Sequence, residues 1–171
     1  MGQPLAVAKG VYWLRMPLPF SLNHINLWLL EDDVGWTIVD TGINTSACKE
    51  LWQHVFDNHL NNKPVHQLVV THLHPDHVGL AGWICETWGL ELQMSRMDYM
   101  ACRVLMSDTG KPAPKAAISF YQRAGVVMNS WRVTKPSLVV MVKAFTPCLK
   151  AMCASKMVNQ SAWLARSGTL S

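Results

Sequence analysis

The sequence predicts a mixed domain of strands and helices in the α/β (α+β) class. Three observations favour this class: runs of β-forming residues occupy the first forty positions, a segment of helical periodicity follows them, and a second strand and helix flank a histidine-rich loop. A chain of 171 residues, half of them apolar, has the length and composition of one domain with its own core.

Three strands are predicted first. Residues 11–15 contain β-forming side chains and end before Pro17 and Pro19. Residues 25–30 are nearly all apolar, which predicts a central strand, and the polar turn at 31–35 leads back into a strand over 36–39. The second and third strands are therefore predicted to form a hairpin.

Helical periodicity begins after this hairpin. Residues 45–60 are predicted to form a helix whose buried face carries Ala47, Leu51 and Val55, with Phe56 and Leu60 beside them. The later predicted elements are a strand starting near residue 66, a helix over 80–88 ending at Gly89, a strand over 90–94, and helices over 96–107 and 116–123.

The loop Thr71–His77 contains three of the seven histidines of the chain and one carboxylate. An apolar strand precedes it, and a turn leading into a helix follows it. His72 and His74 are expected to point to the same side because side chains alternate in an extended segment. Pro75 bends the chain, so Asp76 and His77 approach from another direction. Imidazole and carboxylate are ligands suited to zinc and similar ions.

His72-x-His74-x-Asp76-His77 resembles the signature of the metallo-β-lactamase-fold hydrolases. The upstream run 36–42, which ends in Asp40-Thr41-Gly42, resembles the strand that precedes this signature in the family. The resemblance covers roughly residues 10–125. It implies an αββα sandwich with one or two Zn²⁺ ions at the sheet edge.

The resemblance also implies residue roles. His72 and His74 would bind a first metal, and Asp76 and His77 a second, while Asp40 would lie behind the ligands. Asp76 would in addition orient or shuttle a proton in catalysis. Without the resemblance, Asp40 is equally well explained as a turn former or helix cap.

The five cysteines, at positions 48, 85, 102, 148 and 153, form no disulfide framework. The first twenty residues do not resemble a signal peptide, and no run of about 18 apolar residues exists. A reducing, cytoplasmic location without membrane contact is therefore the expectation. No feature of the sequence indicates an oligomeric state.

The charge distribution divides the chain at Gly125. Residues 1–125 carry nine Lys and Arg and eleven Asp and Glu, a net charge of −2, whereas residues 126–171 carry six Lys and Arg and no acid, a net charge of +6. The basicity thus belongs to the tail, and nucleic acid is not an expected partner. Residues 1–125 are predicted to be the N-terminal part of the family domain, and 126–171 a tail outside it.

One hypothesis for this tail is translation of a shifted reading frame. Back-translation with free codon choice permits, in another frame from Met128, an acid-balanced sequence that resembles the continuation of the family. The alternative is a genuine divergent tail. The nucleotide sequence across codon 125 distinguishes the two.

No histidine follows His77, and no Asp or Glu follows Asp108. The family takes further ligands from downstream, so the resemblance leaves this chain with four donors and with one face of its sheet uncovered. The leading hypothesis is a metal-dependent hydrolase that uses a metal-activated water on a small-molecule thioester or other ester-like bond. The alternative is an inactive, truncated fragment with residual metal binding, and a nucleic-acid hydrolase ranks below both.

Overall fold

The computed structural model describes residues 1–107 together with residues 116, 119 and 123. The strands are β1 (Leu5–Ala8), β2 (Val11–Pro17), β3 (His24–Glu31), β4 (Trp36–Val39), β5 (Val65–Val69) and β6 (Leu92–Gln93). The helices are α1 (Ser46–Asn58), α2 (Pro75–Val78), α3 (Ala81–Trp88) and α4 (Arg96–Ser107). This α+β arrangement confirms the predicted class.

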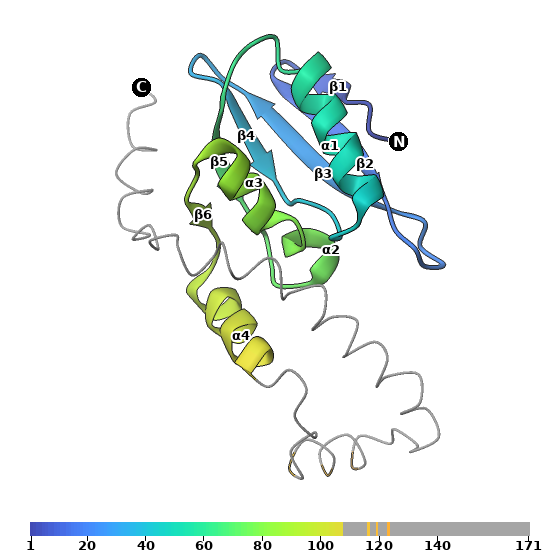
Figure 1. Ribbon diagram of the computed structural model, residues 1–171, viewed down its shortest axis with the longest axis vertical. Helices are drawn as coiled ribbons and strands as arrows, with labels where there is room; N and C mark the ends of the chain where they lie inside the picture. The colour runs from blue at the N-terminus through green and yellow to red at the C-terminus, as the bar shows by residue number, and fades with distance from the viewer. Residues whose placement is uncertain (108–115, 117–118, 120–122, 124–171) are drawn as a thin grey trace.

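The six strands form one sheet in the order of the chain (Figure 1). β1 to β4 pair antiparallel, whereas β5 pairs parallel to β4 and β6 parallel to β5. A parallel pair needs a long crossover between its strands, and α1 provides it between β4 and β5. Because β4 and β5 run in the same direction, the loops that follow them emerge at one edge of the sheet.

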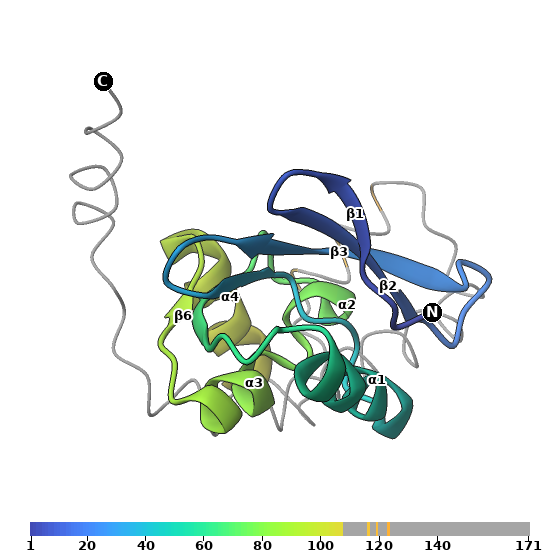
Figure 2. The same cartoon turned by 90° about the horizontal axis from the view of Figure 1, so that it is seen from above.

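The sheet has one buried face, beneath α1 and α3. Figure 2 shows both helices on one side of the sheet, and the described part of the chain places no helix over the other side of β1, β2 and β3. Leu14, Leu27 and Leu29 point to the helices and are buried. Trp28 and Leu30 alternate with them on the opposite face and remain 39% and 37% exposed. The apolar run predicted as a central strand is thus central in the sheet but buried on only one side.

The buried face of α1 agrees with the prediction at Val55 and, just beyond the helix, at Leu60, but it differs in its first two turns. Cys48, Trp52 and Val55 are its buried residues, whereas Ala47 is exposed and Leu51 is half-buried. The core-facing stripe is therefore turned toward Trp52, which buries more apolar area than Leu51 and has a hydrogen-bond partner for its indole N–H. Thr45 caps the helix by accepting a hydrogen bond from Cys48 N at 3.2 Å.

The other predicted elements are largely confirmed. The strands near 11–15, 25–30, 36–39 and 66–70 and the helices over 80–88 and 96–107 are present within one or two residues at most ends. β1 was not predicted, and the strand expected over 90–94 has only two residues. The helix expected over 116–123 lies mostly outside the described residues.

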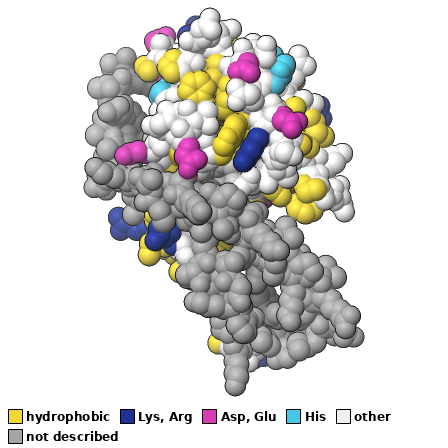
Figure 3. Space-filling model, viewed as in Figure 1, with side chains coloured by type: hydrophobic (Ala, Val, Ile, Leu, Met, Phe, Trp, Pro, Cys, Tyr) yellow, Lys and Arg dark blue, Asp and Glu magenta, His cyan; other side chains and the backbone are white. Residues whose placement is uncertain are grey.

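Figure 3 shows the face of the molecule that includes α1 and α3. On the described part of this face, the acidic side chains are scattered and do not form a single patch. Among the described helices, none combines the length and the apolar character needed to cross a bilayer.

Neighbouring leucines on opposite faces of β3 provide a test of this burial. Leu29→Ala should lower the free energy of unfolding by about 2–5 kcal/mol, because the side chain is fully buried and leaves a cavity. Leu30→Ala, the matched control on the exposed face, should cost less than about 1 kcal/mol. If urea unfolding showed the same loss of unfolding free energy for both variants, the assignment of the buried face would be wrong.

Candidate metal centre

The candidate centre lies where two loops meet at the edge of the sheet. The loop after β4 starts with Asp40, whose N–H donates to Val69 O at 2.9 Å, at the end of β5. Thr41 N then donates to His77 O at 2.8 Å. Asp40 has φ of 62° and Gly42 has φ of 86°, so the backbone turns sharply to run beside the histidine loop.

Gly79 allows the two loops to approach closely. A Cβ at this position would lie 2.3 Å from Pro75 O, 2.8 Å from Gly42 O and 2.9 Å from Asn44 N. All three neighbours are backbone atoms, which cannot rotate away as the end of a side chain can. Only glycine therefore fits where α2 meets the β4–α1 loop.

The buried carboxylate of Asp40 connects the two loops. It is 5% exposed, and its Oδ1 accepts a hydrogen bond from Thr71 N at 2.8 Å. Its Oδ2 accepts from the Thr71 hydroxyl at 2.8 Å and from His77 Nδ1 at 2.8 Å. Hydrogen bonds to an ionised carboxylate are worth about 1.5–3 kcal/mol each, so this one side chain holds both ends of the histidine loop.

These bonds also assign the tautomers of two histidines. The single Thr71 hydroxyl proton goes to Asp40, which is only an acceptor, so the same oxygen accepts from His72 Nδ1 at 2.9 Å. His77 Nδ1 likewise carries the proton that it donates to Asp40. When these rings are neutral, Nε2 is therefore left with its lone pair, the form that a metal ligand needs.

The four predicted ligands form two pairs. His72 Nε2 lies 2.9 Å from His74 Nδ1, and His77 Nε2 lies 3.7 Å from Asp76 Oδ2. The ring of His72 lies between the other two, with centroids 4.6 Å from His74 and 4.0 Å from His77. The sequence predicted that His72 and His74 point to the same side of an extended segment; in the structure both follow the end of β5 and lie in a loop.

Within the cluster, the pKa values of His72 and His77 shift in opposite directions. Burial lowers the pKa of His72, and the neighbouring His77 and His74 lower it further, which favours the neutral imidazole. Burial alone would lower the pKa of His77, but the hydrogen bond and charge of Asp40 raise it overall. Burial alone would raise the pKa of Asp40, and the bonds from His77 and Thr71 lower it overall.

The donor set fits a zinc-type ion in chemistry and partly in arrangement. Two imidazole nitrogens on one tetrahedral zinc lie about 3.3 Å apart, given Zn–N bonds near 2 Å, so the 2.9 Å between His72 and His74 needs only a small opening. Within the described part of the chain, however, no three His, Cys, Asp or Glu side chains are placed so that they could hold one ion. The cluster is thus a set of donor pairs.

Two residues that position the loop were not singled out from the sequence. Thr71 was only counted as part of the loop, although it links Asp40 to His72. Asp98 accepts a hydrogen bond from Leu73 N at 3.1 Å and bonds the Ser95 hydroxyl, so it joins α4 to the histidine loop. The Ser-x-x-Asp spacing of Ser95 and Asp98 is a helix-start signal that could have drawn attention to this position.

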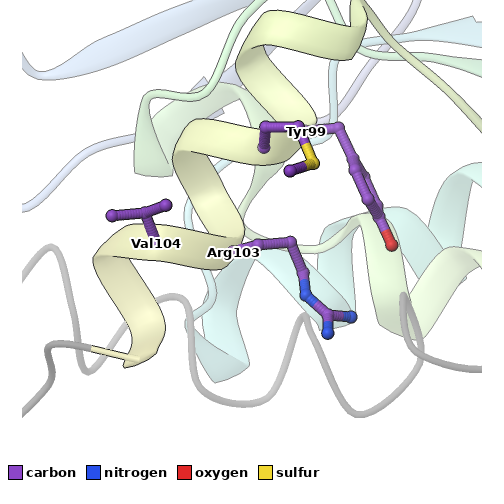
Figure 4. A pocket seen from close by; sticks show the side chains of 4 residues that line it. Tyr99, Arg103 and Val104 are labelled. Atoms are coloured by element: carbon purple, nitrogen blue, oxygen red, sulfur yellow. The ribbon is translucent and has the colours of Figure 1, made fainter.

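α4 also borders an open hollow of about 440 Å³. Figure 4 shows its described lining, which is formed by Tyr99, Met100, Arg103 and Val104. Among these described residues the side chains are apolar, aromatic or cationic, and none is an imidazole or a carboxylate. The hollow is therefore a feature separate from the histidine loop.

Comparison with known proteins agrees with this geometry. A family model described as the Metallo-beta-lactamase superfamily matches residues 21–138, more than half of the chain. The chain belongs to this superfamily. The match includes both loops of the centre and ends a little beyond the boundary predicted at residue 125, which stays a prediction.

The chain matches only a part of each individual relative, because these relatives are larger proteins. A probable metallo-hydrolase, YqjP, of Bacillus subtilis is 32% identical over 73 residues, which cover 42% of this chain and 23% of that protein. The crystal structure of a beta-lactamase domain protein from Burkholderia ambifaria is 47% identical with a TM-score of 0.62, covering 70% of this chain and 36% of that one. The chain thus spans about a quarter to a third of these relatives.

A metallo-beta-lactamase from Pontibacter korlensis shares the fold alone. It is 18% identical with a TM-score of 0.50, and the alignment covers 66% of this chain and 50% of that chain. The family-model match and the structural similarity together confirm the family and the fold class expected from the residues.

The shifted pKa values predict a pH dependence of the metal-free protein. A raised His77 pKa stabilises the fold below the usual value of 6.5, and this contribution disappears as pH rises through the folded pKa. A lowered Asp40 pKa stabilises it above 3.8, and this contribution disappears as pH falls through the folded pKa. Asp40→Asn should therefore cost more stability at pH 5.5 than at pH 8.5, measured by urea unfolding with a chelator present.

Asp57→Asn is the matched control, because Asp57 is an exposed carboxylate on α1 that accepts from Gln53. Its effect should be small and equal at the two pH values. The same loss for Asp40→Asn at both pH values would contradict the assigned Asp40–His77 pair.

A second prediction concerns the contact of the two loops. Gly79→Ala should lower the free energy of unfolding by about 1–3 kcal/mol, because the added methyl group collides with three backbone atoms. Gly89→Ala is the control: nothing lies within 4 Å of a Cβ there, and only the cost of its φ of 65° remains. A stable, wild-type-like Gly79→Ala protein would show that the loops are farther apart than described.

Proposed function

We propose that this chain carries the metal-binding loop of a zinc-dependent hydrolase. The observation that supports this most is the pairing of donors at the end of β5, with His72 facing His74 and His77 facing Asp76. This pairing supports two neighbouring metal sites, which together would hold one or two ions. Imidazole and carboxylate donors are the ligand types that zinc takes in catalytic sites.

In this proposal His72 would bind one ion through Nε2 and His74 through Nδ1, the two atoms that face each other. His74 Nδ1 would give up the proton that it donates to His72 Nε2 in the metal-free protein. His77 Nε2 and Asp76 Oδ2 serve the second. Bound zinc supplies a Lewis acid that polarises the substrate and makes water easier to deprotonate. Asp76, half-exposed beside His77, orients a water molecule and takes a proton on its carboxylate.

Asp40 acts behind these groups. It keeps Nε2 of His77 free by holding the Nδ1 proton, and it does the same for His72 through Thr71. Such partners of the ligands raise their basicity and fix their orientation. The role proposed for Asp40 is therefore support of the ligands.

The proposed substrate is a small molecule with an ester-like bond, and a thioester is favoured. The family fold accommodates several such bonds, so this choice comes from the cytoplasmic location expected of the sequence. The net charge of −2 on residues 1–125 argues against a polyanionic substrate such as nucleic acid.

The alternative is that the chain by itself has no hydrolase activity. It is favoured by the lack of a converged group of three donors among the described residues and by the lack of any histidine after His77. A catalytic zinc needs three firm protein ligands. On this reading the four donors bind metal weakly and without turnover.

Metal binding tests the proposal. His72→Ala and His74→Ala should each weaken zinc affinity more than about 100-fold, because partners behind the ligands alone are worth 10–100-fold. His54→Ala, an exposed histidine on α1, should leave affinity unchanged. Affinity is measured by competition with a chelating dye, and turnover with a thioester and an aryl ester.

The outcomes separate the two readings. Zinc binding with turnover supports the hydrolase, and zinc binding without turnover supports the alternative. A parent chain that takes up no zinc, or a His72→Ala variant equal to His54→Ala, would overturn the proposed centre.

A further inference from the structure

A buried tryptophan on α1 reaches the loop that supports the candidate centre. Trp52 is fully buried, and its indole Nε1 donates a hydrogen bond to Thr41 O at 2.7 Å. The accepting carbonyl lies next to Asp40, in the turn with positive φ. α1 therefore contacts the centre through a directional bond as well as through packing.

Thr41 passes this connection on to the histidine loop. Its N–H and its hydroxyl both donate to His77 O, at 2.8 Å and 2.7 Å. The same hydroxyl oxygen accepts from Leu80 N at 3.0 Å, just before α3. One completely buried residue thus holds the backbone on both sides of Gly79.

The ring of Trp52 is itself held on its other side. It stacks on Phe56 with centroids 5.4 Å apart, and Phe56 contacts Trp83 and Trp88 of α3 at 6.0 Å and 5.2 Å. This aromatic cluster joins α1 to α3, the helix that follows the histidine loop. The indole N–H is consequently aimed at Thr41 by a rigid set of neighbours.

We propose that Trp52 is a positioning residue of the metal centre, acting through Thr41 on the backbone of His77 and Leu80. The inference rests on the proposed metal-binding function. Its physical basis is that a buried carbonyl cannot turn to water when its donor is removed, so Thr41 O must move or stay unpaired. A shift of Thr41 is passed on to His77 O, which lies two hydrogen bonds from Trp52, and an unpaired Thr41 O weakens the turn that holds His77.

The chain offers a matched control for this residue. Trp36 is also a buried tryptophan, 1% exposed, and its Nε1 donates to a backbone carbonyl, Leu60 O, at 3.0 Å. It lies at the start of β4, whereas Asp40 and Thr41 follow the end of this strand. Trp36→Phe and Trp52→Phe therefore remove the same ring and the same type of bond, and only Trp52→Phe removes the connection to the loop.

The experiment compares the two variants in the full chain. Both should lose thermal stability to a similar extent. Trp52→Phe should weaken zinc affinity about 10-fold, as expected for a partner behind the ligands, and should alter the visible absorption bands of bound Co²⁺. Trp36→Phe should have the same zinc affinity and the same Co²⁺ absorption bands as the parent chain. Equal zinc affinity and equal Co²⁺ spectra for the two variants would overturn the proposal.

A metal-free readout keeps this inference separate from the proposed function. Hydrogen exchange of the Thr41 and Leu80 amides should be faster in Trp52→Phe than in Trp36→Phe, with a chelator present. If the parent chain binds no zinc, the proposed function fails and this exchange alone decides the positioning role. Unchanged exchange at both amides would overturn it.

Two substitutions of Thr41 test the role of its hydroxyl. Thr41→Val removes the hydroxyl with little change in volume and should reproduce the loss of zinc affinity. Thr41→Ser keeps the hydroxyl and should retain most of the zinc affinity of the parent chain. Loss of affinity in both variants to the same degree would show that the hydroxyl does not transmit the effect.

Discussion

The structure depends on one buried carboxylate at the end of a strand. Asp40 takes a backbone conformation that is rare for residues other than glycine, and four hydrogen bonds, three to its side chain and one from its own N–H, hold it there. Its partners come from β5 and from both ends of the histidine loop. The strained turn and the arrangement of His72 and His77 are therefore parts of a single hydrogen-bonded unit.

This unit exists because the sheet changes from antiparallel to parallel pairing at β4 and β5. Parallel strands end at the same edge, so residues about thirty positions apart in the chain come into contact there. The crossover helix α1 then lies directly beside the junction, and its Trp52 contacts Thr41. The topology thus brings α1, the carboxylate of Asp40 and the histidine loop into one network of hydrogen bonds.

The exposed side of the sheet is consistent with the partial match to larger relatives. β3 presents buried leucines to α1 and α3, yet it leaves Trp28 and Leu30 well exposed on its other face. The chain spans 36% of the Burkholderia ambifaria structure that it resembles. Among the described residues, the candidate donors form pairs, and no three of them converge on one point.

The sequence by itself determined the family and the order of most strands and helices, and it singled out the four side chains proposed as donors. These are local properties: strand and helix periodicity, and a spacing of histidines around Pro75. It did not predict that α1 turns Cys48 and Trp52 inward, because several faces of that helix carry apolar residues. Only the tertiary structure decided that Asp40 assigns the tautomers of His72 and His77, and that Thr41 and Asp98 hold the loop. Those contacts join residues far apart in the chain, and no local pattern records which of them meet.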